Sequence, residues 1–121
     1  ITLSVEARLA GLQPLLDGIP HGAAYLIGPP RAPIGYVIVT FGWSVEFGGM
    51  GGFVAEIFVR PGVRGRGVAG EVLLSLPRAL AAAGVKALHL EVAEDNEAAQ
   101  RLYARSGFGL RKGYHLMTRK L

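Results

Sequence analysis

Short apolar runs separated by glycine and proline dominate the first half of the chain. Ala23–Ile27 and Ile34–Phe41 are rich in β-branched and aromatic residues and are bounded by turn residues. They are predicted to be strands, joined by a short proline-rich turn into an antiparallel pair. Phe53–Val59 is apolar except for Glu56, which predicts a strand buried on both faces of a sheet. The glycine run at 48–52 is predicted to be a loop ahead of this strand.

Helical spacing of apolar positions occurs in three segments. Val5–Leu16 mixes three- and four-residue spacings, and Val68–Ala83 carries one continuous apolar stripe, so both are predicted to be helices. Asn96–Arg105 is predicted to be a short helix with a polar side chain capping its start. Leu88–Val92 alternates apolar and polar residues and is predicted to be a strand. Leu110–Leu121 is expected to supply one or two last strands.

The order of these elements indicates the fold class. A helix is followed by a strand pair, a strand, a helix, a strand, a helix and a final strand, which predicts an α/β (α+β) fold with a mixed sheet covered by helices. With 121 residues, the chain is expected to form one domain spanning 1–121. Because the chain begins with Ile1 and not with Met, we expect the N-terminal part to be processed or incomplete.

Composition excludes several kinds of chemistry. The chain has no cysteine, which excludes disulfide frameworks, thiolate nucleophiles and cysteine-based zinc sites. We expect no metal site. No apolar run reaches the roughly 18–20 residues needed to cross a bilayer, and no signal segment opens the chain. The protein is therefore expected to be soluble, cytoplasmic and independent of membranes.

The charge balance leaves the partner open. The formal net charge is +4, from 13 Lys and Arg against 9 Asp and Glu. Much of the excess lies at 60–66 and 101–120. Such a balance is compatible with nucleic acid, with a small molecule that carries phosphate, or with ordinary solvated charge.

A glycine-rich turn between a strand and a helix favours the phosphate interpretation. Phe53–Val59 is followed by a sharp turn and then by the sequence Arg-Gly-Arg-Gly-Val-Ala at 64–69, which runs into the helix. The first N–H groups of a helix lack intrahelical partners, and the helix dipole adds positive charge there. Gly65 and Gly67 would let a diphosphate approach the backbone, and Arg64 and Arg66 would add charge.

Other nucleotide sites fit the turn less well. A P-loop requires a Lys-Ser or Lys-Thr pair after its glycines, and none follows here. The dinucleotide pattern Gly65-x-Gly67-x-x-Gly70 is present, and Glu91 lies near the expected acidic position. That match is weak because hairpin signals, not strand–helix repeats, precede the turn. A plain tight turn with solvated arginines remains an alternative.

A second block downstream identifies a family. The segment 96–108 reads Asn-x-x-Ala-x-x-Leu-Tyr-x-x-x-Gly-Phe, and 64–69 reads Arg-x-x-Gly-x-Ala. Together, in this order and with a strand between them, the two blocks resemble the acyl-CoA motif and the Asn/Tyr motif of the GNAT superfamily of N-acetyltransferases. The resemblance covers roughly residues 35–121.

The resemblance implies a fold and a co-substrate site. The fold would be a mixed, mostly antiparallel sheet with a central parallel strand pair that splays apart, here Phe53–Val59 and Leu88–Val92. A bulge near Phe58–Val59 would free backbone groups for the pantetheine arm of acetyl-CoA. The residues expected to contact acetyl-CoA are Phe58, Val59, Arg64, Gly65, Arg66, Gly67, Val68, Ala69, Gly70, Asn96 and Tyr103.

The implied reaction is acetyl transfer from acetyl-CoA to a primary amine. Tyr103 would lie beside the thioester sulfur and act as general acid, and the backbone amides of Phe58 and Val59 would polarise the carbonyl. Glu56 is expected to be buried and to accept the proton of the amine, or else only to bind a cationic substrate. Glu91 on the neighbouring strand is the rival candidate.

The acceptor side is expected to lie around the loop before Phe53. Trp43, Glu46 and Glu91 are the candidate acceptor-binding residues, because aromatic rings with carboxylates suit a cationic amine such as an aminoglycoside, a polyamine or a peptide N-terminus. A non-catalytic acyl-CoA-binding or sensing domain is the first alternative. A nucleic-acid module is the second, although no stacking aromatic residues interleave with the basic ones. A homodimer is expected.

Overall fold

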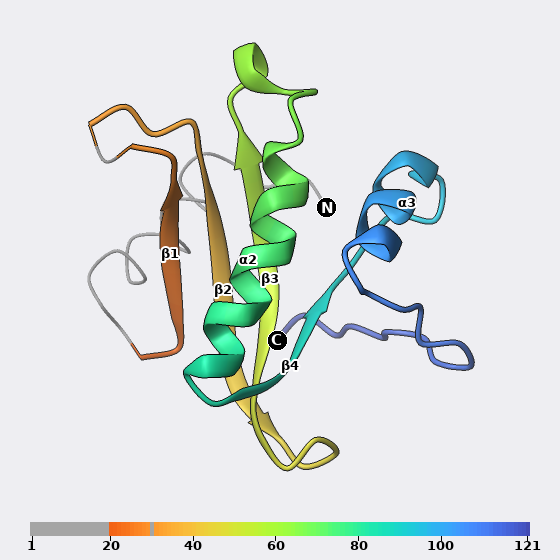
Figure 1. Ribbon diagram of the computed structural model, residues 1–121. Helices are drawn as coiled ribbons and strands as arrows, with labels where there is room; N and C mark the ends of the chain where they lie inside the picture. Colours follow the sequence, from red (N-terminus) through yellow and green to blue (C-terminus); the bar gives the residue numbers. More distant parts are fainter. Residues whose placement is uncertain (1–19, 30) are drawn as a thin grey trace.

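The computed structural model describes residues 20–29 and 31–121 (Figure 1). The helix predicted at Val5–Leu16 lies outside the described residues. Four strands form a mixed sheet in the order β1-β2-β3-β4. Their bounds are β1 Gly22–Ile27, β2 Gly35–Ser44, β3 Gly49–Val59 and β4 Val85–Leu90. The first three strands are antiparallel neighbours, and β4 runs parallel to β3. The predicted fold class is confirmed.

Two α-helices and a short 3₁₀ turn complete the described part of the chain. The turn η1 (Pro61–Val63) leads from β3 into α2 (Val68–Ala82), and α3 (Glu97–Arg105) follows β4. The helix α2 lies across one face of the sheet, and α3 lies beside β4 where that strand diverges (Figure 1). Neither described helix has the length and apolar character needed to cross a bilayer.

The core lies between α2 and the sheet. Leu73 on the inner face of α2 is completely buried. The cluster of buried residues that joins the helix to the strands is Val37, Val39, Val54, Leu76 and Leu80. Burial of these side chains supplies the main driving force that holds α2 on the sheet. It also holds the start of α2 next to the end of β3.

Residues 49–52 of the glycine run belong to β3, so their prediction as a loop is wrong. The hairpin turn covers only 45–48, and β3 begins at Gly49. A Cβ atom at Gly52 would lie 3.1 Å from a methyl group of Leu88 on β4 and 3.4 Å from a methyl group of Val39 on β2. Glycine therefore gives the side chains of both neighbouring strands room to close over β3.

A β-bulge at Ala55 changes the direction in which β3 presents its side chains. Ile38 on β2 pairs with Glu56, but the next residue, Val39, pairs with Val54. Ala55 is therefore the extra residue of the bulge and has no partner on β2.

The bulge places Glu56 on the open face of the sheet. Val54 before the bulge and Ile57 after it both contact the core cluster, although strict alternation would place them on opposite faces. Glu56 is exposed, so the expectation that it is buried is wrong. The bulge expected near Phe58–Val59 is also misplaced, because both residues pair regularly with β2.

The parallel strands separate at the end of β3. Their pairing runs from Met50 opposite Val85 to Val54 opposite Leu90. β4 then ends, whereas β3 continues to Val59. The predicted splayed pair is confirmed, and its open end lies beside the glycine-rich turn.

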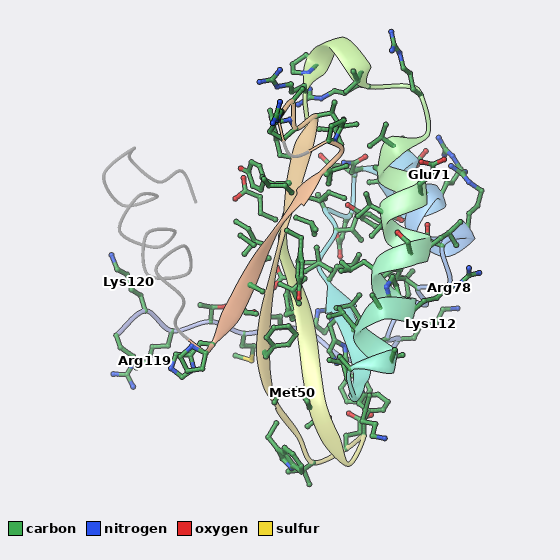
Figure 2. The ribbon with its side chains drawn as sticks, turned by 60° about the vertical axis from the view of Figure 1, so that its left-hand side comes forward. Met50, Glu71, Arg78, Lys112, Arg119 and Lys120 are labelled. Carbon is green, nitrogen blue, oxygen red and sulfur yellow. The ribbon has the colours of Figure 1, made fainter. Side chains whose placement is uncertain are left out.

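The C-terminal segment forms no strand in the described structure, so the strands predicted at Leu110–Leu121 are wrong. Gly113 adopts a φ of +87°, which turns the chain and interrupts extended structure. The segment passes to the face of the sheet opposite α2, where Arg119 and Lys120 lie (Figure 2). Leu116 and Met117 in this segment are largely exposed.

Candidate active site

The glycine-rich turn leaves the start of α2 open to a ligand. Gly65 and Gly67 have φ values of +81° and +75°, a region that other residues rarely adopt. Gly67 caps α2, and no side chain of the described residues bonds to the first helical N–H groups. Those groups and the helix dipole therefore remain available to an anion. A Cβ at either glycine would meet no atom within 4 Å, so the space beside the turn is open.

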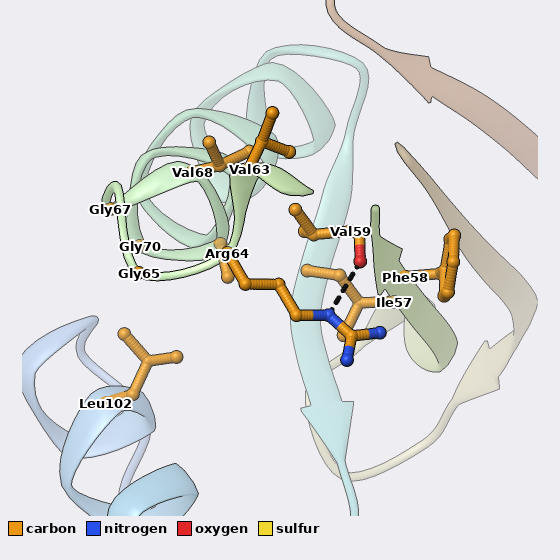
Figure 3. Close-up of a pocket in the computed structure, with 11 residues that line it drawn as sticks. Ile57, Phe58, Val59, Val63, Arg64, Gly65, Gly67, Val68, Gly70 and Leu102 are labelled. Atoms are coloured by element: carbon orange, nitrogen blue, oxygen red, sulfur yellow. Dashed lines mark hydrogen bonds between the residues drawn. The ribbon is translucent and has the colours of Figure 1, made fainter. Parts of the chain in front are cut away.

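The side chain of Arg64 is hydrogen-bonded to the end of β3. Its Nε donates a hydrogen bond to the carbonyl oxygen of Val59 at 2.8 Å, and its guanidinium carbon lies 5.6 Å from the centre of the Phe58 ring (Figure 3). Arg66 is exposed and has no hydrogen bond or ion pair with the described residues. The sequence predicts the same role for the two arginines, but their surroundings in the structure differ.

A cavity of about 440 Å³ lies between the end of β3, the turn and α3 (Figure 3). The predicted co-substrate residues that line it are Phe58, Val59, Arg64, Gly65, Gly67, Val68, Ala69 and Gly70. Ile57, Val63 and Leu102 also line it and were missed, because apolar residues carry no chemical signature. Arg66 and Asn96 do not line it. The cavity lies between the open glycine-rich turn and the part of β3 that extends beyond its pairing with β4.

Glu56 accepts a hydrogen bond from Tyr36, a residue that belongs to neither sequence motif. The hydroxyl of Tyr36 donates to Oε1 of Glu56 at 2.7 Å, and the Tyr36 ring stacks on Phe58 with centroids 5.5 Å apart. Tyr36 stands opposite Phe58 in the β2–β3 pair. Tyr36 lies two residues before the β2 residue that pairs with Glu56. This spacing could have suggested the contact, but the pairing follows only when the position of the bulge is known.

Tyr103 occupies a well-defined position in the last turn of α3. Gly107 takes a φ of +95°, and the N–H of Phe108 donates to the carbonyl oxygen of Tyr103 at 3.0 Å. The two rings meet edge to face at 6.3 Å. These are the features of a Schellman cap. At the other end of α3, Oδ1 of Asn96 accepts from the N–H of Ala99 at 3.1 Å, so Asn96 is the helix cap.

Tyr103 faces a second, larger cavity, of about 930 Å³. Gln100, His89 and Glu91 also line it, together with Phe47 and Phe53. Leu102, the neighbour of Tyr103, lines the smaller cavity, so consecutive residues of α3 reach the two spaces. Glu56 lines neither cavity, so the structure does not bring the two predicted catalytic side chains into one cavity.

The three residues predicted to bind the acceptor differ in their surroundings. Both carboxylate oxygens of Glu46 accept from Arg111, at 3.0 and 2.8 Å, and this hydrogen bond and the charge of Glu46 raise the pKa of Arg111. Trp43 is 74% exposed and lines neither cavity. Glu91 alone of the three lines the larger cavity. Within the described residues, no three His, Asp or Glu side chains gather as a metal site.

Comparisons with known proteins agree with this geometry. The sequence profile of the acetyltransferase (GNAT) family matches residues 6–108. An integron cassette protein from the mobile metagenome of Cole Harbour Salt Marsh is 32% identical, with 99% of this chain and 73% of that chain covered and a TM-score of 0.78. No curated protein matches the sequence.

Two aminoglycoside acetyltransferase structures share the fold at lower identity. AAC(6')-Iy, in complex with the bisubstrate analogue CoA-S-monomethyl-acetylneamine, is 21% identical, with 98% of this chain and 82% of that chain covered and a TM-score of 0.77. The 6'-N-acetyltransferase AAC(6')-Ig from Acinetobacter haemolyticus is 18% identical, with 100% and 85% covered and a TM-score of 0.75.

Proposed function

The chain belongs to the acetyltransferase (GNAT) family, and we propose that it transfers the acetyl group of acetyl-CoA to a primary amine of a small molecule or peptide. One observation carries the proposal. The cavity beside the glycine-rich turn joins uncapped helical N–H groups to the strand edge that the splay leaves free. The first feature suits the diphosphate of a CoA thioester, and the second suits its extended, amide-containing arm.

The two cavities suggest how donor and acceptor are arranged. The diphosphate would bind at Gly65–Gly70, and the arm would follow β3 toward α3. The thioester would reach Tyr103, whose hydroxyl has no hydrogen-bond partner among the described residues and can donate one. The larger cavity, with Glu91 on its wall, would admit the amine. Glu46 is already paired with Arg111, so we assign the attraction of the cationic acceptor to Glu91.

Side chains of the protein would donate and accept the protons of the reaction. Acetyl-CoA supplies a thioester carbonyl that the amine nitrogen attacks, with loss of the C–S bond. Glu56 would take one proton from the ammonium group of the acceptor, directly or through water, before the free amine attacks. Tyr103 would give a proton to the departing sulfur and take up the second proton, which the attacking nitrogen releases. Holding the two reactants together would supply most of the acceleration.

The test is CoA release by the purified protein with acetyl-CoA and a panel of monoamines, polyamines, amino sugars and peptides with free N-termini. We expect release that depends on the amine, with the acetylated amine as product. The separation of Tyr103 from Glu56 favours one other function, a non-catalytic acyl-CoA-binding domain. Tight CoA binding without acetylation of any amine in the panel would establish that function in place of ours.

Replacing Glu56 with glutamine tests its part in proton transfer. Since Gln cannot take up the amine proton, we expect kcat/KM near neutral pH to fall about 100-fold, the lower end of the range for general acid–base catalysis. The loss should shrink as the pH rises, because the amine then loses its proton to solvent. The measurement is the pH profile of kcat/KM, with Glu94→Gln as the control for loss of an exposed carboxylate. A loss that is equal at every pH would show that Glu56 binds the acceptor but accepts no proton.

A further inference from the structure

The last peptide unit of β3 is held from both sides. Its carbonyl oxygen, on Val59, accepts from Nε of Arg64 at 2.8 Å. Its N–H, on Arg60, donates to the carbonyl oxygen of Ile34 at 2.8 Å. Pairing with β4 ends at Val54 and Leu90, so Arg64 donates to Val59 at a point where β4 no longer can. The plane of this peptide unit is therefore fixed by two hydrogen bonds.

Arg64 also contacts the side chains that lead to Glu56. Its guanidinium lies over the Phe58 ring at 5.6 Å, and that ring stacks on Tyr36 at 5.5 Å. Tyr36 in turn donates to Glu56 at 2.7 Å. One continuous set of contacts thus runs from the glycine-rich turn to the candidate proton acceptor.

We infer that Arg64 is a positioning residue: it holds the end of β3 in the geometry that receives the pantetheine arm, and charge attraction to the diphosphate is not its main role. The inference rests on the proposed function, because it concerns the same acetyl-CoA site. Arg66, which has no hydrogen bond or ion pair with the described residues, is left as the side chain that supplies charge to the diphosphate.

The bond to Val59 gives the inference a chemical signature. In glutamine, Nε2 is separated from Cα by the same number of bonds as Nε in arginine, so Arg64→Gln keeps an N–H donor at this place and loses the charge. Arg64→Lys keeps the charge and loses the donor at this place, along with the planar group over Phe58. A positioning role therefore predicts that Arg64→Gln keeps more activity than Arg64→Lys, and a charge role predicts the opposite.

The experiment compares two acetyl donors, acetyl-CoA and S-acetylpantetheine. The second compound has the pantetheine arm and the thioester but no diphosphate. We expect Arg64→Lys to lower kcat/KM about 10-fold with both donors, the loss typical of one hydrogen bond to a charged group. Arg64→Gln should stay close to wild type with S-acetylpantetheine. Arg66→Ala should lower kcat/KM with acetyl-CoA only. Arg78→Lys, an exposed change on α2, should alter neither value.

The outcomes separate this inference from the proposed function. If Arg64→Lys weakens the reaction with acetyl-CoA alone, or if Arg64→Gln is the worse variant with S-acetylpantetheine, Arg64 serves as a charge and the inference is overturned. If the wild type transfers no acetyl group, the dissociation constants of CoA and pantetheine, measured by NMR titration on the same variants, decide the same question. A wild type that binds neither compound would overturn both proposals. Thermal unfolding of each variant shows whether it is folded.

Discussion

Tyr103→Phe is expected to lower kcat about 100-fold or more while the affinity for CoA changes little. The ring would keep its edge-to-face contact with Phe108 and the Schellman cap would remain, since both involve atoms that phenylalanine retains. Only the hydroxyl is lost, and with it the proton that we propose Tyr103 gives to the departing sulfur. General acid–base catalysis by a positioned side chain contributes about 10²- to 10⁴-fold, so this loss should be the largest effect on turnover.

Two measurements check the result. CoA release gives kcat, and calorimetric titration gives the dissociation constant of CoA. Tyr25→Phe on β1 is the matched control, because Tyr25 lines neither cavity and its variant should behave as wild type. Full turnover by Tyr103→Phe would remove Tyr103 from the catalytic role and leave proton donation to water or to another side chain.

Gly35→Ala, at the first residue of β2, is expected to destabilise the end of β3, with which it pairs. A Cβ at Gly35 would overlap the backbone carbonyl oxygen of Phe58 and lie 3.1 Å from Cα of Val59. Backbone atoms cannot rotate away as a side chain can, so β2 and β3 would have to separate. We expect the free energy of unfolding to fall by about 3 kcal/mol, the upper part of the range for overpacking. CoA affinity should fall as well, because Phe58 and Val59 line the cavity.

Gly42→Ala provides the control in the same strand. A Cβ at Gly42 would meet no atom within 4 Å. Alanine there restricts the unfolded chain without strain in the folded one, so stability should be unchanged or rise by up to about 1 kcal/mol. Urea denaturation of both variants measures the difference. Equal stabilities would mean that β2 and β3 can move apart at little cost, and the close approach at Gly35 would not be a constraint.

Regular patterns in the sequence predicted most of the described elements, and irregular features were not predictable from it. The apolar stripe of α2 and the alternation in β4 report burial on one face, and both elements exist. The bulge at Ala55 leaves no trace in composition, yet one extra residue moves Glu56 from the core to the open face. Gly49, Gly51 and Gly52 resemble loop residues by type, and only neighbouring side chains show why they belong to a strand.

The candidate site likewise contains residues that the sequence could predict and contacts that it could not. Local motifs located Gly65, Gly67 and Tyr103, because backbone geometry at a turn and a cap depends on nearby residues. The pairing of Glu46 with Arg111 joins residues that lie 65 positions apart, and no local pattern carries that information. The hydrogen bond of Tyr36 to Glu56 depends on register across two strands, which a single sequence does not reveal.

The separation of β3 from β4 also bears on aggregation. Past Val54, one edge of β3 has no partner strand in the described structure, and such an edge can template the addition of a strand from another chain. Two features described above obstruct that addition. The bulge at Ala55 disturbs the regular spacing of backbone groups at one end, and Arg64 occupies the carbonyl oxygen of Val59 at the other. The strand edge that we propose receives the acyl arm is thereby protected from pairing with a second polypeptide.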